Sequence, residues 1–171
     1  PINLLTHCEA PVGSGLGASS TLTVAIVKAF DDFLGLSLGE YELAQMAFDI
    51  ERIELGLSGG QQDQYAAAFG GFNFIDFKKN TQVIVNPLRI RNWITSELEA
   101  SLVLYYTGTS RESANIIDEQ MNLMERGDTT VFEKLHMIKN NAKVMKEHLL
   151  MGELPEVANF LDKGWREKKA T

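Results

Sequence analysis

The chain has 171 residues, of which 44% are hydrophobic, so it can bury one substantial core or two smaller ones. Its formal net charge of −7 argues against a general affinity for nucleic acid or for an anionic membrane surface. The sequence contains no apolar run of membrane-spanning length, and its single cysteine, Cys8, excludes an internal disulfide and fits a reducing, cytoplasmic compartment.

The N-terminal half predicts one strand followed by helices and a hairpin. Residues 2–10 are apolar and strand-like, which would place Cys8 in the core. Helices are expected over residues 18–34, 38–54 and 63–69. Alternating phenylalanines from Phe72 then begin a strand, which turns at 78–80 and returns over 82–85.

The C-terminal half predicts a second, largely helical part. After Pro87 a linker of about ten residues is expected, and residues 101–106 read as a strand. Capping patterns at Thr109 and Asp128 then predict two helices, the first ending near Arg126. A last helix is expected from about Pro155 to Trp165. The predicted class is mixed α+β with antiparallel pairing.

The most informative stretch is residues 11–21, which contain glycine at 13, 15 and 17 and lead into the first helix. Glycine reaches backbone angles closed to other residues and lets the chain approach a ligand closely. The first amides of a helix lack partners within it, and the helix dipole makes that end partly positive. Such a loop therefore suits the phosphates of a nucleotide, although a glycine-rich turn capped by Ser19 or Ser20 is the alternative.

Two common nucleotide loops do not fit this stretch. The P-loop needs a lysine directly before the hydroxyl residue, whereas Ala18 precedes Ser19. The glycine spacing also satisfies the dinucleotide-fold pattern, but that fold requires an acidic residue at the end of a second strand roughly 20 positions on. Asp31 and Asp32 come too early, inside the helical pattern, and a second helix follows instead of a strand.

Two acidic residues downstream are candidates for the chemistry. Glu51 continues the apolar stripe of Ala44, Ala47 and Phe48, so its carboxylate is expected to be buried and to need a cation. An arginine partner, or exposure where the stripe meets solvent, is the alternative. Asp63 stands in the first turn of a short helix after a glycine pair, where an ionised carboxylate is favoured and where a simple N-cap is the alternative.

Residues 11–21 resemble the second motif of the GHMP kinases (galacto-, homoserine, mevalonate and phosphomevalonate kinases), written P-x-x-x-G-L-G-S-S-A-A. Residues 11, 15, 16, 17 and 19 match it, and residues 18, 20 and 21 are small-for-small departures. Asp63 and Gln64 end a stretch that resembles the family's G-x-x-D-Q segment. Glu51 stands twelve residues before Asp63, as the metal-binding glutamate does in galactokinase-like members.

This resemblance implies a GHMP kinase-like two-lobe α+β fold. A ribosomal protein S5 domain 2-like N-terminal lobe would occupy residues 1–98, and the first part of a C-terminal α+β lobe would occupy residues 99–171. The family's first and third motifs are absent, so we expect an internal fragment with an incomplete fold. Exposed sheet edges and apolar surface would then favour self-association, for example as a homodimer.

The resemblance also implies ATP and Mg²⁺ as cofactors and assigns roles to the site residues. Ser19 and Glu51 would bind Mg²⁺, and Asp63 would be the catalytic residue that faces the acceptor hydroxyl. The nucleotide phosphates would be held by Gly13, Ser14, Gly15, Leu16, Gly17, Ala18, Ser19 and Ser20.

Within the family, residues 59–74, 86–90 and 106–114 are most similar to the bacterial heptose-phosphate kinases. The implied reaction phosphorylates the anomeric hydroxyl of D-glycero-D-manno-heptose 7-phosphate, a step toward nucleotide-activated heptose. Candidates for contacts with the sugar phosphate are Gly60, Gln62, Arg89 and Arg111, and a surface salt bridge is the alternative for each arginine. Another kinase of the family, galactokinase- or fucokinase-like, and a non-catalytic sugar-phosphate or nucleotide-binding regulator are the alternative functions. No nucleic acid or membrane partner is expected.

Overall fold

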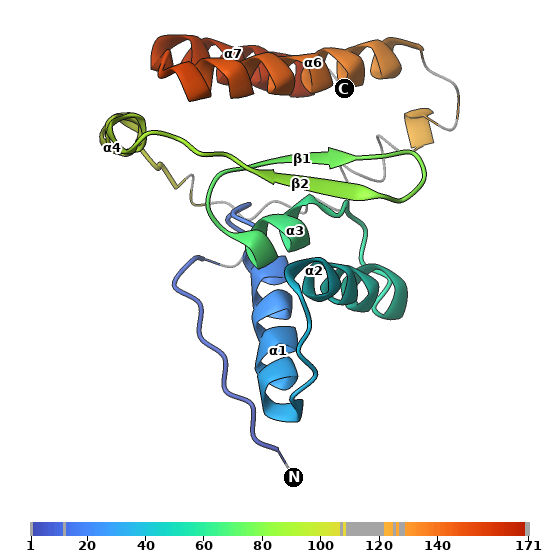
Figure 1. Cartoon of the computed structure of the whole chain (residues 1–171). Coiled ribbons are helices and arrows are strands. Elements are labelled where there is room, and N and C mark those ends of the chain that lie inside the picture. Colours follow the sequence, from blue (N-terminus) through green and yellow to red (C-terminus); the bar gives the residue numbers. More distant parts are fainter. Residues whose placement is uncertain are drawn as a thin grey trace. The chain divides into compact units, whose positions relative to one another are not determined.

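The structure is a computed structural model that describes residues 2–11, 13–106, 108, 122–124, 126 and 129–169. It divides into two compact units, one formed by Pro1–Val85 with Tyr105–Ile117 and the other by Asn86–Leu104 with Asp118–Thr171. Its mixture of helices and paired strands confirms the predicted α+β class. The elements of Figure 1 are α1 (Ala18–Leu34), α2 (Glu40–Phe48), η1 (Asp49–Glu54), α3 (Gln62–Phe69), β1 (Asn73–Phe77), β2 (Val83–Pro87), α4 (Asn92–Ser101), α6 (Thr129–Met151) and α7 (Leu154–Lys169).

The core of the first unit lies where α1, α2 and α3 pack together (Figure 1). Val24 and Val27 of α1 are buried against Leu43 and Ala47 of α2. These side chains recur at helical spacing, so each helix presents one apolar stripe to the others. The packing brings the N-terminus of α1, which carries the glycine loop, beside the first turn of α3.

A two-stranded sheet extends this core on the side of α3. β1 and β2 form the predicted hairpin, closed by the Lys78 N–H donating to the Gln82 carbonyl at 2.8 Å. Val85 of β2 is buried with Tyr65 of α3, and its N–H donates to the Tyr41 hydroxyl at 2.9 Å. The hairpin is therefore anchored to both α2 and α3.

The predicted helix over residues 38–54 consists of two kinds of helix. α2 has ordinary α-helical hydrogen bonds, and η1 continues it directly as a π-helix. The wider spacing of the π-helix shows at its end, where the Leu55 N–H donates to the Ile50 carbonyl, five residues back, at 3.0 Å. π-Helical turns are rare and occur frequently at functional sites. Here the π-helix carries Glu51.

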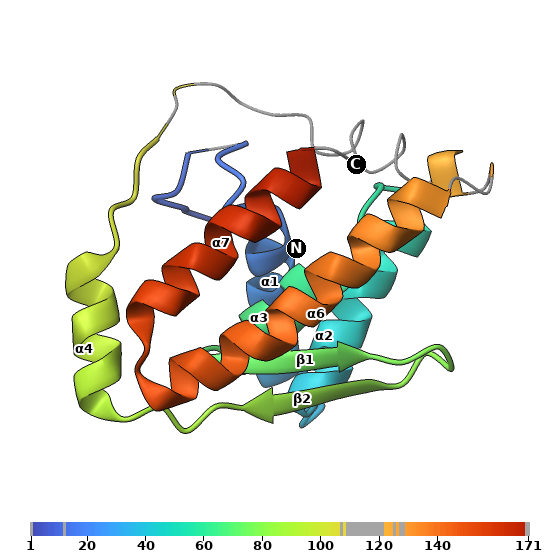
Figure 2. The same cartoon turned by 90° about the horizontal axis from the view of Figure 1, so that it is seen from above.

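The second unit is largely helical in the part that the structure describes. α6 and α7 run side by side (Figure 2), and α4 contributes the buried Ile94 to a cluster with Leu154 and Val157. Gly152 makes the turn between α6 and α7 with a positive φ of 82°. Side chains crowd this turn, because a Cβ on Gly152 would lie 2.3 Å from the Trp93 ring.

Two predicted strands are wrong. Residues 2–8 form no regular secondary structure, and Cys8 is exposed rather than part of the core. α4 (Asn92–Ser101) forms where a linker of about ten residues after Pro87 was expected and takes in the first residue of the strand predicted over 101–106, whose other residues, 102–106, are irregular. Both segments have the composition of a strand, but in the described part of the chain only β1 and β2 pair with each other. An isolated strand is not stable without a neighbour to accept its hydrogen bonds.

Some predictions stay open. The helix expected from Thr109 to Arg126 lies mostly outside the described residues, and so do its capping residues and Asp128. The division into family lobes at residue 98 also remains a prediction. Among the described helices, none combines the length and apolarity needed to cross a membrane.

Candidate functional site

The glycine loop has the backbone conformation that its sequence predicts. Gly13, Gly15 and Gly17 have φ values of 72°, 74° and 70°, the left-handed region that favours glycine. Gly17 is the N-cap of α1, and no side chain caps this helix. A Cβ on Gly15 would meet nothing within 4 Å, so the loop surface beside it is open. The first amides of α1 therefore lack a side-chain acceptor, which is the arrangement that anions use at helix N-termini.

Ser19 and Glu51 meet although 32 residues separate them. The Ser19 hydroxyl, in the first turn of α1, donates to Glu51 Oε1 at 3.2 Å. Glu51 is only 2% exposed and belongs to η1, which packs its carboxylate into the molecule. The apolar stripe had predicted this burial, and neither an exposed position nor an ion pair with lysine or arginine is found for Glu51 among the described residues.

Gln64 of α3 completes the environment of the Glu51 carboxylate. Its amide nitrogen donates to Glu51 Oε2 at 2.5 Å and to the Ser20 hydroxyl at 3.2 Å. The orientation of the amide follows from chemistry, since an ionised carboxylate only accepts hydrogen bonds and the NH₂ group must face it. Ser20 is buried, so its hydroxyl faces the protein and only its backbone N–H remains for a phosphate.

Asp63 lies against the last glycine of the loop. It belongs to the first turn of α3, and a Cβ on Gly17 would sit 3.6 Å from the Asp63 carboxyl carbon. The packing of α3 on α1 thus brings Asp63 to the loop, while η1 brings Glu51 to Ser19. The structure gathers all three predicted groups at the N-terminal end of α1, and the chemical role of each remains a prediction.

Arg52 supports the segment that leads into α3, and sequence reasoning missed this role. Its guanidinium lies against Gly59, where a Cβ would come within 2.6 Å. It donates to the carbonyls of Leu57 and Gly60, both at 3.4 Å. Glycine at position 59 leaves room for the guanidinium, but a single glycine does not indicate such a contact in the sequence.

Three buried side-chain atoms lack hydrogen-bond partners in the described part of the chain, and all lie at this site. They are Ser14 Oγ in the loop, Gln61 Oε1 just before α3, and Gln64 Oε1. Buried polar atoms in folded proteins almost always have partners, so each calls for a water or a ligand group. Their position beside the loop fits a site that binds a polar ligand.

The donor set fits Mg²⁺ with a nucleotide. Mg²⁺ takes oxygen ligands and is usually bound by one or two protein side chains together with substrate phosphates. The Glu51 carboxylate and the Ser19 hydroxyl supply such oxygens. No group of three metal-ligating His, Cys, Asp or Glu side chains occurs in the described ranges, so no site built wholly from such side chains is found there.

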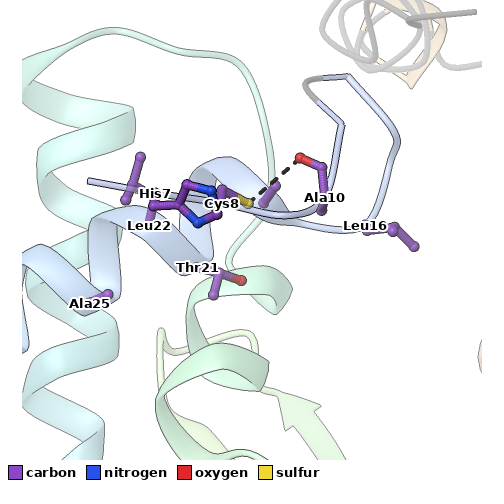
Figure 3. A pocket seen from close by; sticks show the side chains of 8 residues that line it. His7, Cys8, Ala10, Leu16, Thr21, Leu22 and Ala25 are labelled. Atoms are coloured by element: carbon purple, nitrogen blue, oxygen red, sulfur yellow. Dashed lines mark hydrogen bonds between the residues drawn. The ribbon is translucent and has the colours of Figure 1, made fainter. Parts of the chain in front are cut away.

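A pocket of about 230 Å³ lies along another face of the first turns of α1 (Figure 3). It includes neither Ser19, Glu51 nor Asp63, and exposed Cys8 stands at its wall with its thiol directed to the Ala10 carbonyl. Leu16 and Ala18 connect it to the loop. Its lining is His7, Cys8, Ala10, Leu16, Ala18, Thr21, Leu22 and Ala25.

The residues expected to contact a sugar phosphate are not brought into hydrogen bonds with this site. Gly60 and Gln62 are exposed, next to the α3 N-terminus. Arg89 is exposed and belongs to the other compact unit, and Arg111 lies outside the described residues. All four assignments remain predictions.

Comparison with known proteins gives consistent matches. Residues 1–71 match the family model for the GHMP kinases N terminal domain. The chain is 52% identical to the D-glycero-alpha-D-manno-heptose 7-phosphate kinase of Campylobacter jejuni, over 98% of this chain and 49% of that protein. It is 30% identical to the L-fucokinase/L-fucose-1-P guanylyltransferase of Bacteroides fragilis, over 94% of this chain and 17% of that protein.

A solved structure is similar as well. The crystal structure of a D-glycero-D-manno-heptose 1-phosphate kinase from Bacteroides thetaiotaomicron superposes with a TM-score of 0.79 at 48% identity, covering 95% of this chain and 46% of that one. The chain therefore spans about half the length of the heptose-phosphate kinases that it matches.

Proposed function

Because the chain belongs to the GHMP kinase family, we propose that the protein transfers the γ-phosphoryl group of ATP to a hydroxyl of a sugar phosphate. The observation that carries this proposal is the meeting of Ser19, Glu51 and Asp63 at the open glycine loop. Phosphoryl transfer needs few covalent steps from the protein, so positioning and neutralisation of charge dominate the catalysis.

The loop and the first turn of α1 would bind the nucleotide phosphates through their backbone amides. Ser19 and Glu51 would hold Mg²⁺, which neutralises charge on the phosphates when bound. Glu51 suits this role because its charge is buried and, among the described residues, receives only neutral donors. A buried anion without a cation is unfavourable, so binding of a cation next to Glu51 would be favourable.

Asp63 would orient the acceptor hydroxyl and take its proton. A carboxylate is too weak a base to ionise a sugar hydroxyl before the reaction begins. Its contribution is therefore alignment, followed by proton capture as the new bond to phosphorus forms. The contact of Asp63 with Gly17 supports this role, since it places the carboxylate beside the loop that would hold the phosphates.

The acceptor that we propose is D-glycero-D-manno-heptose 7-phosphate, phosphorylated at its anomeric hydroxyl. The heptose-phosphate kinases that resemble this chain support a heptose phosphate, although their names place the phosphate at position 7 in one case and at position 1 in the other. The two substrates differ chemically, because a 1-phosphate has no free anomeric hydroxyl. A kinase specific for that hydroxyl must reject it.

The test is transfer from γ-labelled ATP by the full-length protein. Heptose 7-phosphate should yield a 1,7-bisphosphate, while heptose 1-phosphate, galactose and fucose should give little product. Preferred labelling of galactose or fucose would favour the galactokinase- or fucokinase-like alternative. Binding of nucleotide or sugar phosphate without transfer to any acceptor would contradict the kinase proposal and favour a regulator.

A further inference from the structure

Gln64 is a buried residue to which the proposed reaction assigns no role so far. Its side chain is 0% exposed and lies where α1, η1 and α3 meet. The amide NH₂ group has two protons, and both are donated: one to Glu51 Oε2 and the other to the Ser20 hydroxyl. One side chain of α3 thus connects the element that carries Glu51 with the element that carries Ser19.

The hydrogen bonds around Glu51 fix its carboxylate in one orientation. Oε1 accepts from Ser19 of α1, and Oε2 accepts from Gln64 of α3. Two donors from different helices restrain both the rotation and the tilt of the group. Each carboxylate oxygen still has a free lone pair, so these bonds do not compete with a cation for the carboxylate. Hydrogen bonds of this kind orient metal ligands in many metalloproteins.

A purely structural role does not explain Gln64. Its Oε1 atom is buried without a partner among the described residues, and such an atom is unfavourable for folding. An apolar side chain of similar shape would avoid that cost, but it would take away the donor to Glu51 Oε2 and the Ser20 hydroxyl. Natural sequences keep such local conflicts mainly at functional sites.

We propose that Gln64 is a positioning residue that presents the Glu51 carboxylate to a divalent cation. The proposal rests on the proposed function, because it assigns Gln64 to the metal site of that reaction. Asp63 directly precedes Gln64 in the first turn of α3. The same hydrogen bonds therefore also fix Asp63 relative to Glu51 and the loop.

The test replaces Gln64 with methionine, which has a similar length and no donor. Binding of Mn²⁺ to the full-length protein is titrated with a non-hydrolysable ATP analogue present, and free Mn²⁺ is read by electron paramagnetic resonance. We expect Gln64→Met to raise the Mn²⁺ dissociation constant by about tenfold or more. In turnover, the Mg²⁺ concentration for half-activation should rise by a similar factor, while KM for the sugar phosphate stays unchanged.

A control variant tests whether the effect is specific to position 64, and a second Gln64 variant serves if the first does not fold. Gln82→Met makes the same change at an exposed position of the β1–β2 turn and should leave Mn²⁺ binding unchanged. If Gln64→Met does not fold, as judged by circular dichroism, Gln64→Asn serves instead. It keeps the amide but is one methylene shorter, so it cannot reach Glu51, and we expect a similar loss of Mn²⁺ affinity.

The coupling to Glu51 separates positioning from general destabilisation. On a Glu51→Gln background, Gln64→Met should produce no further loss of Mn²⁺ affinity, because there is no carboxylate left to orient. Additive losses, or native Mn²⁺ affinity in a folded Gln64 variant, would overturn the proposal. Failure of the native protein to phosphorylate any sugar phosphate would contradict the proposed function instead, and the Mn²⁺ titration would still test Gln64.

Discussion

Two buried acidic residues of the first unit differ in whether a positive charge lies beside them. Asp31 and Glu51 are each 2% exposed. Asp31 accepts from the Leu38 N–H at 3.0 Å and from the Lys28 ammonium at 2.7 Å, so its charge is balanced within the protein. Glu51 receives only hydroxyl and amide donors in the described part of the chain. Asp31 therefore has the surroundings of a structural ion pair, whereas those of Glu51 agree with the metal-binding role that we propose for it.

This contrast predicts the behaviour of Glu51→Gln. Without metal, the unfolding free energy should change by less than about 1 kcal/mol, because the loss of a buried charge offsets the disturbed hydrogen bonds. The native full-length protein should gain thermal stability from Mn²⁺ with a non-hydrolysable ATP analogue, and the variant should lose the part of that gain due to the metal. Thermal unfolding with and without Mn²⁺ checks this, and an equal metal-dependent rise in both proteins would refute it.

Asp63 predicts a different pattern of loss. Asp63→Asn keeps the shape but removes the proposed proton acceptor, so kcat should fall by about 10²-fold or more. Affinity for the ATP analogue should change little, because the loop amides do not depend on Asp63. Asp32→Asn, an exposed position of α1, is the control and should keep native kcat. A near-native rate in Asp63→Asn would remove Asp63 from the reaction.

Individual residues show how far sequence reasoning reaches. The stripe that includes Ala44 and Ala47 predicted the burial of Glu51, and the loop glycines indicated backbone angles closed to other residues, which agrees with their positive φ values. Both follow from local periodicity and backbone sterics. The contacts of Gln64 and Arg52 could not be predicted, since they depend on how three helices pack and leave no periodic signal in the sequence.

At the scale of elements, Asp31 stabilises the connection between α1 and α2, and this contribution to stability depends on pH. The Leu38 N–H, followed by the Lys28 ammonium, holds the pKa of Asp31 below its usual range. Its stabilising effect is therefore complete above the unfolded-state pKa of about 3.9 and is lost as the pH falls from there through the lower folded-state pKa.

Urea unfolding at several pH values tests this effect. Asp31→Asn should lower the unfolding free energy at pH 7, and the difference from the native chain should shrink as the medium becomes strongly acidic. Asp32→Asn is the matched control, because Asp32 is largely exposed and contacts the same lysine at 2.9 Å. Its effect at pH 7 should be small, as for most surface ion pairs. Equal losses in the two variants would argue against the special role of Asp31.

Replacing a glycine by alanine should have opposite effects on stability at two positions, one in the turn between α6 and α7 and one inside α7. Gly152 has a positive φ and faces the Trp93 ring, so Gly152→Ala should destabilise the protein by about 1–3 kcal/mol. Gly164 lies within α7, and a Cβ there would meet nothing within 4 Å, so Gly164→Ala should stabilise by about 0.5–1 kcal/mol. Chemical denaturation measures both, and a neutral Gly152→Ala would contradict the crowding.

Helices were more predictable than strands because they satisfy their own hydrogen bonds. α1 spans the predicted residues 18–34, with a glycine on either side of it, and its apolar stripe packs against α2. A strand depends on a partner elsewhere in the chain, and the strand composition of residues 2–8 and 102–106 does not supply one. The π-helix of η1 could not be predicted either, since α- and π-helical turns differ too little in side-chain pattern over six residues.

On the scale of the whole molecule, the two segments that lack strand pairing are also strongly apolar at the surface. Leu5 is 97% exposed and Val103 is 87% exposed, and several neighbours in each segment are exposed apolar residues. Among the described residues, both strands of the β1–β2 hairpin are sheet edges as well. Unpaired edges and exposed apolar runs are the features by which polypeptides associate.

The 171-residue chain is therefore expected to self-associate. Light scattering after size-exclusion chromatography should give a mass above that of one chain, and the mass should rise with concentration. Leu5→Lys and Val103→Lys should each reduce association, because a charge on an unpaired segment opposes pairing between chains. Thr6→Lys adds the same charge without removing an apolar side chain, so its effect should be smaller than that of Leu5→Lys. A single-chain mass at every concentration would show that these segments find their partners within one molecule.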